Sequence, residues 1–171
     1  EKVVQEIVAL GGKAIANGGN VTSEQDMQAM ADQTMDAFGR IDILVNNAGI
    51  LRDKTFSKMS LEDFRTVLEV HLMGSVVATR AVLPRMKQQE YGRIVMTSSS
   101  SGLYGNFGQS NYGAAKLGLV GLVNTLKLEL FKSGIRVNAL APVAATRMTD
   151  DIMPPQMLEL LTPETVSPAV L

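Results

Sequence analysis

Short apolar segments alternate along this chain with longer segments of helical periodicity, and this alternation constrains the fold more than any other feature. The segments 41–45, 93–97 and 135–140 predict buried strands, and each follows a predicted helix. Strands separated by helices are typical of parallel sheets, because a parallel neighbour is reached only through a long crossover. We therefore expect an α/β fold, a doubly wound parallel sheet with helices on both faces.

The predicted helices begin at capping signals. Ser23 and Ser60 each stand three residues before an aspartate, which is the spacing of a capping box. Pro84 predicts a kink or a late break in the helix that contains it. Besides the three strands, the expected elements are helices over 3–10, 23–38, 60–86 and 109–131 and a short strand over 13–16.

The two ends of the chain resemble the interior of a domain rather than its limits. Residue 1 opens directly into a helix, and no segment has the pattern of a first strand followed by a glycine turn that binds a pyrophosphate. A further helix is expected to start near Pro163, close to the last residue. We expect residues 1–171 to form one incomplete domain that lacks the N-terminal glycine-rich loop and the C-terminal end.

The composition excludes several functional classes. There are 16 Lys and Arg against 17 Asp and Glu with no basic cluster, so nucleic acid is not an expected partner. With no cysteine and one histidine, thiolate and histidine-rich metal sites are excluded, and any cofactor is expected to be organic. No apolar run approaches the roughly 20 residues that cross a bilayer, and residues 1–10 do not resemble a signal peptide. We expect a cytoplasmic protein with no membrane partner.

Small residues follow the first predicted strand. Parallel sheets of this kind bind ligands beyond the carboxyl ends of their strands. The segment Asn46-Asn47-Ala48-Gly49 stands there, and its small residues let the backbone approach a flat ring or a ribose closely. Taken alone, the segment is equally well interpreted as a plain turn.

Ser99, Tyr112 and Lys116 form the main candidate for a catalytic site. Tyr112 and Lys116 are four residues apart on a predicted helix, so their side chains share a face. A tyrosine ionises at about pH 10, but a nearby ammonium favours the phenolate and lowers that pKa. The Ser99 hydroxyl is placed to hydrogen-bond a substrate oxygen. These are the parts of a carbonyl reductase, although the Tyr and Lys alone would also suit a helix surface.

The order of these motifs resembles one enzyme family. Asn-Asn-Ala-Gly is followed by a strand ending in Ser-Ser, by Tyr112-x-x-x-Lys116 and by a strand that leads to Pro142. Over essentially the whole chain, this series is similar to the short-chain dehydrogenases/reductases, which have a Rossmann-like fold. The resemblance implies hydride transfer between NAD or NADP and a carbonyl or alcohol, with Tyr112 as the acid/base and Ser99 orienting the substrate.

The resemblance also implies a cofactor-binding set, whose members lie mostly just after the strands. The implied residues are Asn20 and Val21 beside the adenine, Asn47, Ala48 and Gly49 along the cofactor, Tyr112 and Lys116 at the nicotinamide and its ribose, Pro142 and Val143 after the last strand, and Thr146 near the carboxamide.

Two positions depart from the family pattern. Val143 stands where glycine usually follows the proline, so the resemblance does not fix the backbone path beside the nicotinamide. His71 stands where the family typically carries an asparagine that bends a helix and holds a water of a proton relay. The sequence leaves two roles for this catalytic candidate. In the first role His71 carries protons, because histidine titrates near neutral pH. In the second role its side chain only takes part in helix packing.

Further segments favour one branch of the family. His71, the segments 50–53 and 104–109, and Arg147-Met148-Thr149 are similar to the (3R)-hydroxyacyl-CoA dehydrogenases of peroxisomal multifunctional enzymes and their bacterial relatives. This resemblance implies oxidation of a 3-hydroxyacyl thioester, with NAD preferred, although the residue that selects NAD or NADP is expected before residue 1. The alternatives are a 3-oxoacyl-acyl-carrier-protein reductase that uses NADPH and a non-catalytic nucleotide-binding or scaffold protein. A homodimer or homotetramer is expected for the complete protein.

Overall fold

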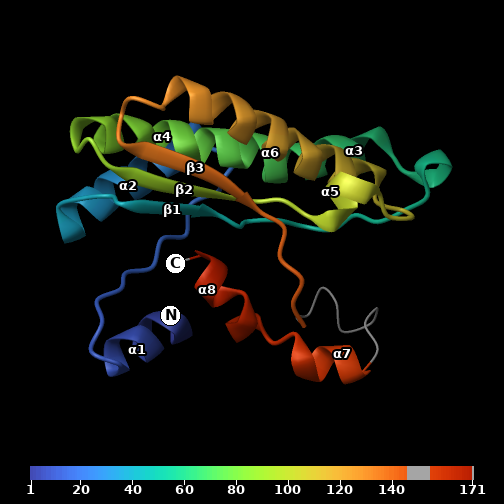
Figure 1. The fold of residues 1–171 in the computed structure, drawn as a ribbon, viewed down its shortest axis with the longest axis horizontal. Helices are drawn as coiled ribbons and strands as arrows, with labels where there is room; N and C mark the ends of the chain where they lie inside the picture. The colour runs from blue at the N-terminus through green and yellow to red at the C-terminus, as the bar shows by residue number, and fades with distance from the viewer. Residues whose placement is uncertain (146–154, 171) are drawn as a thin grey trace.

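The sheet has three parallel strands, each close to a position where the sequence predicts one. The computed structural model describes residues 1–145 and 155–170. The strands are β1 (Ile43–Asn46), β2 (Gly92–Thr97) and β3 (Ile135–Leu140), in the order β1-β2-β3 (Figure 1). In the parallel register, Val45 lies opposite Val95, which lies opposite Asn138. The carboxyl ends of all three strands therefore reach the same edge of the sheet, and the α/β fold class is confirmed.

The prediction of a short strand over 13–16 is wrong. This segment is irregular in the structure and runs between the first two helices. A strand forms only where its backbone hydrogen-bonds a neighbouring strand, and no strand of the described sheet pairs with this segment. Local β propensity was not sufficient without a partner.

Helices connect the strands, and the two serines cap them as predicted. Ser23 Oγ accepts a hydrogen bond from the Asp26 amide at 3.1 Å, and Ser60 Oγ accepts one from the Asp63 amide at 3.0 Å. The α-helices are α1 (Lys2–Ala9), α2 (Glu24–Phe38), α3 (Leu61–Leu68), α4 (Gly74–Gln88), α5 (Ser100–Tyr104), α6 (Ser110–Glu129), α7 (Pro155–Leu160) and α8 (Ser167–Val170). The 3₁₀ turns are η1 (Phe56–Lys58) and η3 (Pro163–Thr165), and the π-helical turn is η2 (Glu69–Met73).

The longest helical segment runs from α3 through η2 into α4. Pro84 lies inside α4, which continues to Gln88, so the proline does not end the helix. By length and composition alone, Leu61–Gln88 would be long and apolar enough to cross a membrane, a possibility that the sequence analysis did not foresee. Half of its most apolar part is buried inside the fold, and the core helix of a globular protein meets the same criteria.

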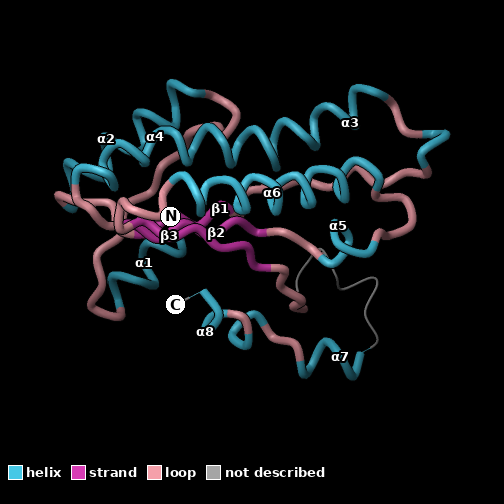
Figure 2. Tube along the Cα trace, turned by 45° about the horizontal axis from the view of Figure 1, so that its top comes forward, coloured by secondary structure: helices cyan, strands magenta, loops and turns pink. Residues whose placement is uncertain are grey.

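The core lies between one face of the sheet and the helices that cover it. Figures 1 and 2 show α4 and α6 across this face, with α2 beside α4. Figure 1 places α1, α7 and α8 on the other side of the sheet, where Ile43 and Val45 of β1 remain exposed. The largest fully buried side chains of the described residues include Met27, Met86, Ile94, Met96, Leu119 and Ile135.

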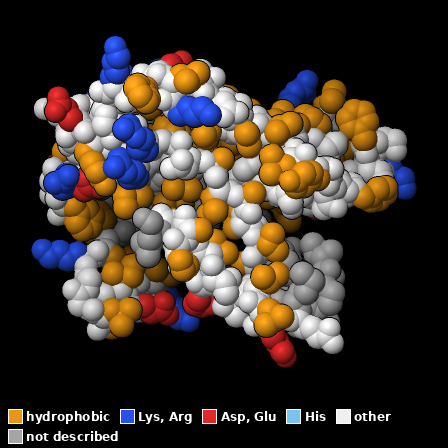
Figure 3. All heavy atoms as spheres, in the orientation of Figure 1, with side chains coloured by type: hydrophobic (Ala, Val, Ile, Leu, Met, Phe, Trp, Pro, Cys, Tyr) orange, Lys and Arg blue, Asp and Glu red, His pale blue; other side chains and the backbone are white. Residues whose placement is uncertain are grey.

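Exposed hydrophobic side chains gather at the end of the molecule that carries α3 and α5 (Figure 3). The largest of them around these helices are Phe56, Tyr104 and Phe107. This is the end toward which the strands run (Figure 1), so an apolar surface adjoins the edge where a ligand is expected.

We predict that Gly134→Ala lowers the free energy of unfolding by more than about 2 kcal/mol. Gly134 has φ +72°, and an added Cβ would overlap the backbone oxygen of Glu90. Gly121→Ala is the matched control, because a Cβ there meets nothing within 4 Å and an alanine favours helix α6. Urea denaturation compares the two variants, and similar midpoints would contradict the prediction.

Candidate functional site

Asn46 fixes the point where the chain leaves β1. It is buried, its Nδ2 donates to Thr79 Oγ1 on α4 at 3.2 Å, and the same nitrogen lies 3.2 Å from Met96 Sδ on β2. Asn47 and Ala48, which follow, are exposed. Within the Asn-Asn-Ala-Gly motif, Asn46 therefore holds the sheet to the helix layer, and Asn47 and Ala48 are exposed at the carboxyl edge.

Lys116 is the most deeply buried charged group of the candidate site. Its side chain is 3% exposed, and its Nζ donates to the Thr97 carbonyl at the end of β2. Ser98 Oγ donates to the backbone carbonyl of Lys116 at 2.9 Å. Nζ lies 5.4 Å from the centroid of the Tyr112 ring, one turn earlier on α6. The shared face expected for Tyr112 and Lys116 is present.

Ser99 meets Tyr112 at the same edge. It lies two residues after the end of β2 and caps α5, where its Oγ accepts a hydrogen bond from the Ser101 amide at 3.1 Å. A hydrogen bond between the side chains of Ser99 and Tyr112 favours the phenolate. The structure thus brings Ser99, Tyr112 and Lys116 together from a strand end and a helix that are separate in the sequence.

The ionisation of Tyr112 differs from the sequence-based expectation. Burial raises the pKa of Tyr112 above its ordinary value, the Ser99 hydrogen bond lowers it, and the Asp53 carboxylate raises it again. The sequence predicted that Lys116 would lower the pKa of Tyr112. This prediction is wrong, because the largest influence on Tyr112 is its burial, which raises the pKa. Burial also lowers the pKa of Lys116 to about 8, which weakens its positive charge just above neutral pH.

His71 lies inside the protein on the π-helical turn η2. Its side chain is 2% exposed, and its ring meets that of Tyr112 edge to face with the centroids 5.1 Å apart. Ser75 Oγ donates to the His71 carbonyl at 2.7 Å, one turn further along the helix. A π turn contains one more residue than an α turn and is frequent at functional sites. The π turn lies at the position where the family resemblance implied a bend in the helix.

A polar network missed by the sequence analysis supports the Tyr112 end of α6. Asn111, fully buried, donates from Nδ2 to the Arg52 carbonyl at 3.1 Å. Gln109 Nε2 donates to Asp53 Oδ2 at 2.7 Å, and the Lys54 amide donates to the Gly108 carbonyl at 2.9 Å. The signal in the sequence was the amide pair at 109 and 111 just before Tyr112, but the partners lie more than fifty residues away.

The proposed adenine segment lies against the start of α4. A Cβ added to Gly74 would lie 2.9 Å from Val21 Cγ2, so the two residues are in close contact. Asn20 Oδ1 accepts a hydrogen bond from the Thr22 amide at 3.1 Å, and the Asn20 amide donates to Asp26 Oδ2 at 2.8 Å. Because α4 also contacts Asn46 through Thr79, this helix links the Asn20 segment to the carboxyl edge of the sheet.

Pro142 and Val143 follow β3, whose carboxyl end adjoins that of β2. Pro142 is half-buried and Val143 is exposed. The structure therefore places both residues at the same edge as Ser99. Thr146 lies outside the described residues, so its role stays a prediction.

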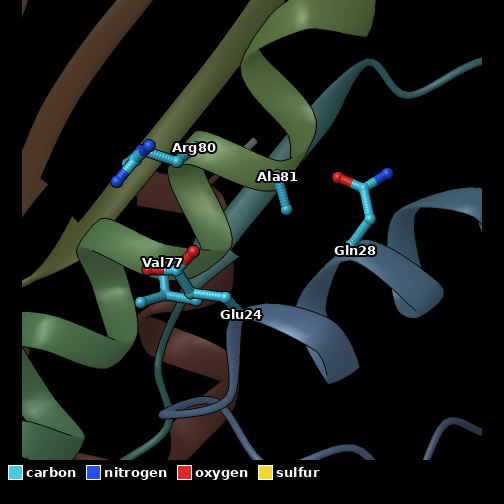
Figure 4. Close-up of a pocket in the computed structure, with 5 residues that line it drawn as sticks. All are labelled: Glu24, Gln28, Val77, Arg80 and Ala81. Atoms are coloured by element: carbon cyan, nitrogen blue, oxygen red, sulfur yellow. The ribbon is translucent and has the colours of Figure 1, made fainter.

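A shallow cavity of about 140 Å³ lies between α2 and α4, away from these residues (Figure 4). It is lined by Glu24, Gln28, Val77, Arg80 and Ala81. Figure 4 shows the Arg80 side chain pointing away from Gln28, so the lining groups do not converge on one point. Among the described residues, no group of three or more His, Cys, Asp or Glu side chains is placed to hold a metal.

Comparison with known proteins identifies the family. The family described as short chain dehydrogenase matches residues 1–156. The chain belongs to the short-chain dehydrogenases/reductases. A crystal structure of a short chain dehydrogenase from Mycobacterium avium has a TM-score of 0.87 and 39% sequence identity, covering 99% of this chain and 59% of that one. The Rossmann-like fold expected from the motifs is therefore confirmed.

Three relatives illustrate the range of this family. A short-chain type dehydrogenase/reductase of Mycobacterium tuberculosis is 55% identical over 170 residues, which are 99% of this chain and 59% of that protein. Peroxisomal multifunctional enzyme type 2 of Mus musculus is 53% identical over the whole chain, which spans 23% of that protein. A 3-oxoacyl-[acyl-carrier-protein] reductase of Synechocystis is 43% identical over 94% of this chain and 66% of that protein. The chain thus spans less than two thirds of the relatives that it matches.

We predict that stability rises with pH more steeply in the wild type than in Lys116→Met between about pH 8 and 10.5. Burial lowers the pKa of Lys116 from 10.5 to about 8, so in this window the unfolded chain binds the proton and the folded protein does not. The difference between the two proteins should change by about 3 kcal/mol across the window. Urea denaturation at several pH values measures it, and parallel curves would show that Lys116 titrates normally.

Proposed function

We propose that the full-length protein is a nicotinamide-dependent enzyme that interconverts a 3-hydroxyacyl thioester and its 3-oxoacyl form. The observation that carries this proposal is the contact of Ser99, Tyr112 and Lys116 at the carboxyl edge of the sheet. The acyl thioester substrate is supported by the name of the Synechocystis relative, a 3-oxoacyl-[acyl-carrier-protein] reductase that is 43% identical over 162 residues.

Tyr112 moves the proton in the proposed reaction. In the direction of oxidation, the phenolate of Tyr112 takes the proton of the substrate hydroxyl, and the Ser99 hydroxyl donates a hydrogen bond to the same substrate oxygen. A bound nicotinamide cofactor supplies the acceptor for the hydride that leaves the carbon. In the direction of reduction, the Tyr112 hydroxyl returns its proton to the oxygen of the 3-oxo group.

The raised pKa of Tyr112 suits the acid step. Burial keeps the phenol protonated at neutral pH, so Tyr112 has a proton to donate when a carbonyl is reduced. For oxidation, the hydrogen bond from Ser99 is the contact that favours the phenolate. The Ser99 hydroxyl has a single proton, so it donates either to Tyr112 or, once the substrate is bound, to the substrate oxygen.

The residues at this edge fit the nicotinamide half of a dinucleotide. Lys116 offers a buried ammonium and Asn47 an exposed amide, both suited to ribose hydroxyls and a carboxamide, and Ala48 leaves room for a flat ring. We propose that this half contacts Asn47, Ala48, Gly49, Tyr112 and Lys116, that the adenine contacts Asn20 and Val21, and that Pro142, Val143 and Thr146 lie beside the carboxamide.

The proposed cofactor, thioester carrier and substrate configuration follow from the resemblance to the (3R)-hydroxyacyl-CoA dehydrogenases. NAD is proposed in preference to NADP, and a coenzyme A thioester of (3R) configuration is the proposed substrate. A cytoplasmic location and a homodimer or homotetramer are proposed for the complete protein. The exposed Leu117 and Leu128 on α6 offer apolar surface for such an assembly.

We predict that Tyr112→Phe lowers kcat for the oxidation of (3R)-hydroxybutyryl-CoA by at least about 100-fold, because the proton then has no acceptor. Tyr91→Phe is the matched control, since Tyr91 is 38% exposed and stands just before β2, at the opposite end of that strand from Ser99, and it should leave kcat unchanged. Reduction of NAD is followed at 340 nm in the full-length protein.

The same assay separates the alternatives. Turnover of a 3-oxoacyl carrier protein with NADPH, but none with NAD and the coenzyme A substrate, would indicate the reductase that the Synechocystis relative represents. Nucleotide binding without turnover of either substrate would indicate a non-catalytic member of the family. Full activity in the Tyr112→Phe variant would contradict the mechanism.

A further inference from the structure

His71 holds the backbone of Ile50 in either of its neutral forms. Its Nε2 lies 2.7 Å from the Ile50 carbonyl oxygen and 3.1 Å from the Ile50 amide nitrogen. With its proton on Nε2 the ring donates to the carbonyl, and with its proton on Nδ1 it accepts from the amide. The first form is favoured, because Nδ1 is buried with no partner among the described residues and a buried lone pair is less costly than a buried N–H.

The same ring limits what can stand at position 49. A Cβ added to Gly49 would overlap Cε1 of His71, and Nδ1 would lie 2.9 Å from it. The imidazole therefore occupies the space next to Gly49, in addition to its edge-to-face contact with Tyr112. One side chain fixes both the end of the Asn47–Gly49 segment and one side of the phenol ring.

The surroundings of His71 favour the neutral imidazole. Burial lowers its pKa, the hydrogen bond with the Ile50 backbone raises it, and the Lys116 charge lowers it again. The groups of the neighbouring helix α6 that face the ring are Tyr112 and Lys116, and neither carries a negative charge at neutral pH. A doubly protonated ring would also carry a buried Nδ1–H with no partner among the described residues. This environment suits a fixed hydrogen-bonding group.

We propose that His71 is a positioning residue, which holds Gly49 and Ile50 in place beside Tyr112 through its hydrogen bonds to Ile50, and that it does not carry protons in the reaction. The proposal rests on the proposed function, because it assigns Asn47–Gly49 to the cofactor and Tyr112 to the proton. If His71 has this role, the affinity for NADH depends on the hydrogen bond between His71 and the backbone of Ile50, which lies just outside the segment Asn47–Gly49.

A pair of substitutions separates positioning from proton transfer. In His71→Gln the carboxamide can donate to the Ile50 carbonyl and accept from the amide, but it cannot carry a proton at neutral pH. His71→Leu has a similar volume and can do neither. In the full-length protein, we expect His71→Leu to raise the NADH Kd at least tenfold and His71→Gln to stay within threefold of the wild type, with an unchanged pH profile of kcat.

The opposite pattern would overturn the proposal. A His71→Gln variant that binds NADH normally but loses kcat as fully as His71→Leu, or that loses one limb of the pH profile, would make His71 a proton carrier. Equal NADH affinity in the wild type and His71→Leu would show that the Ile50 hydrogen bonds do not position the cofactor segment.

A second measurement applies even if His71→Leu does not fold. Gly49→Ala should raise the NADH Kd at least tenfold in the wild type, but less than threefold in combination with His71→Asn, whose shorter side chain vacates the space that the new Cβ needs. The same fold-change in both backgrounds would contradict the proposal. NADH binding without turnover would sink the proposed function but leave this comparison valid, whereas a wild type that binds neither NADH nor NADPH would overturn both.

Discussion

The attachment of α6 to the end of β2 at Lys116 is the interaction on which the candidate site depends. The Lys116 ammonium donates to the Thr97 carbonyl, and the Lys116 carbonyl accepts from Ser98 Oγ. One residue is thus tied to the same strand end through its side chain and its backbone. Because Tyr112 lies one helical turn earlier and Ser99 follows Ser98, fixing Lys116 places the phenol and the serine hydroxyl within reach of each other.

Burial at this attachment decides the charges of the site. It raises the pKa of Tyr112 and lowers that of Lys116, so both shifts favour the neutral form of the side chain. With a pKa of about 8, Lys116 still carries its proton at neutral pH, whereas Tyr112 is a neutral phenol. The Ser99 side chain opposes the effect of burial on Tyr112, but the pKa of Tyr112 remains raised.

The sequence predicted those parts of the fold that depend on local pattern or on motif order. The three strands and the capped helices α2 and α3 are local, because apolar runs and a serine three residues before an aspartate need no distant partner. The strand expected at 13–16 failed because pairing is not local. The hydrogen bond of Asn111 to Arg52 and the net pKa of Tyr112 were also out of reach, because both depend on which distant segments bury the residue.

The π-helical turn at Glu69–Met73 changes the phase of the longest helix. One residue in an α-helix corresponds to a rotation of about 100°, so the extra residue in this turn rotates the face that α4 presents relative to that of α3. α3 packs against α6, whereas α4 packs against α2 and the sheet. A single continuous element thus serves two different layers of the protein. Deleting one residue from this turn would affect the packing of the whole domain, because it would rotate the apolar side chains of α4 away from α2 and the sheet.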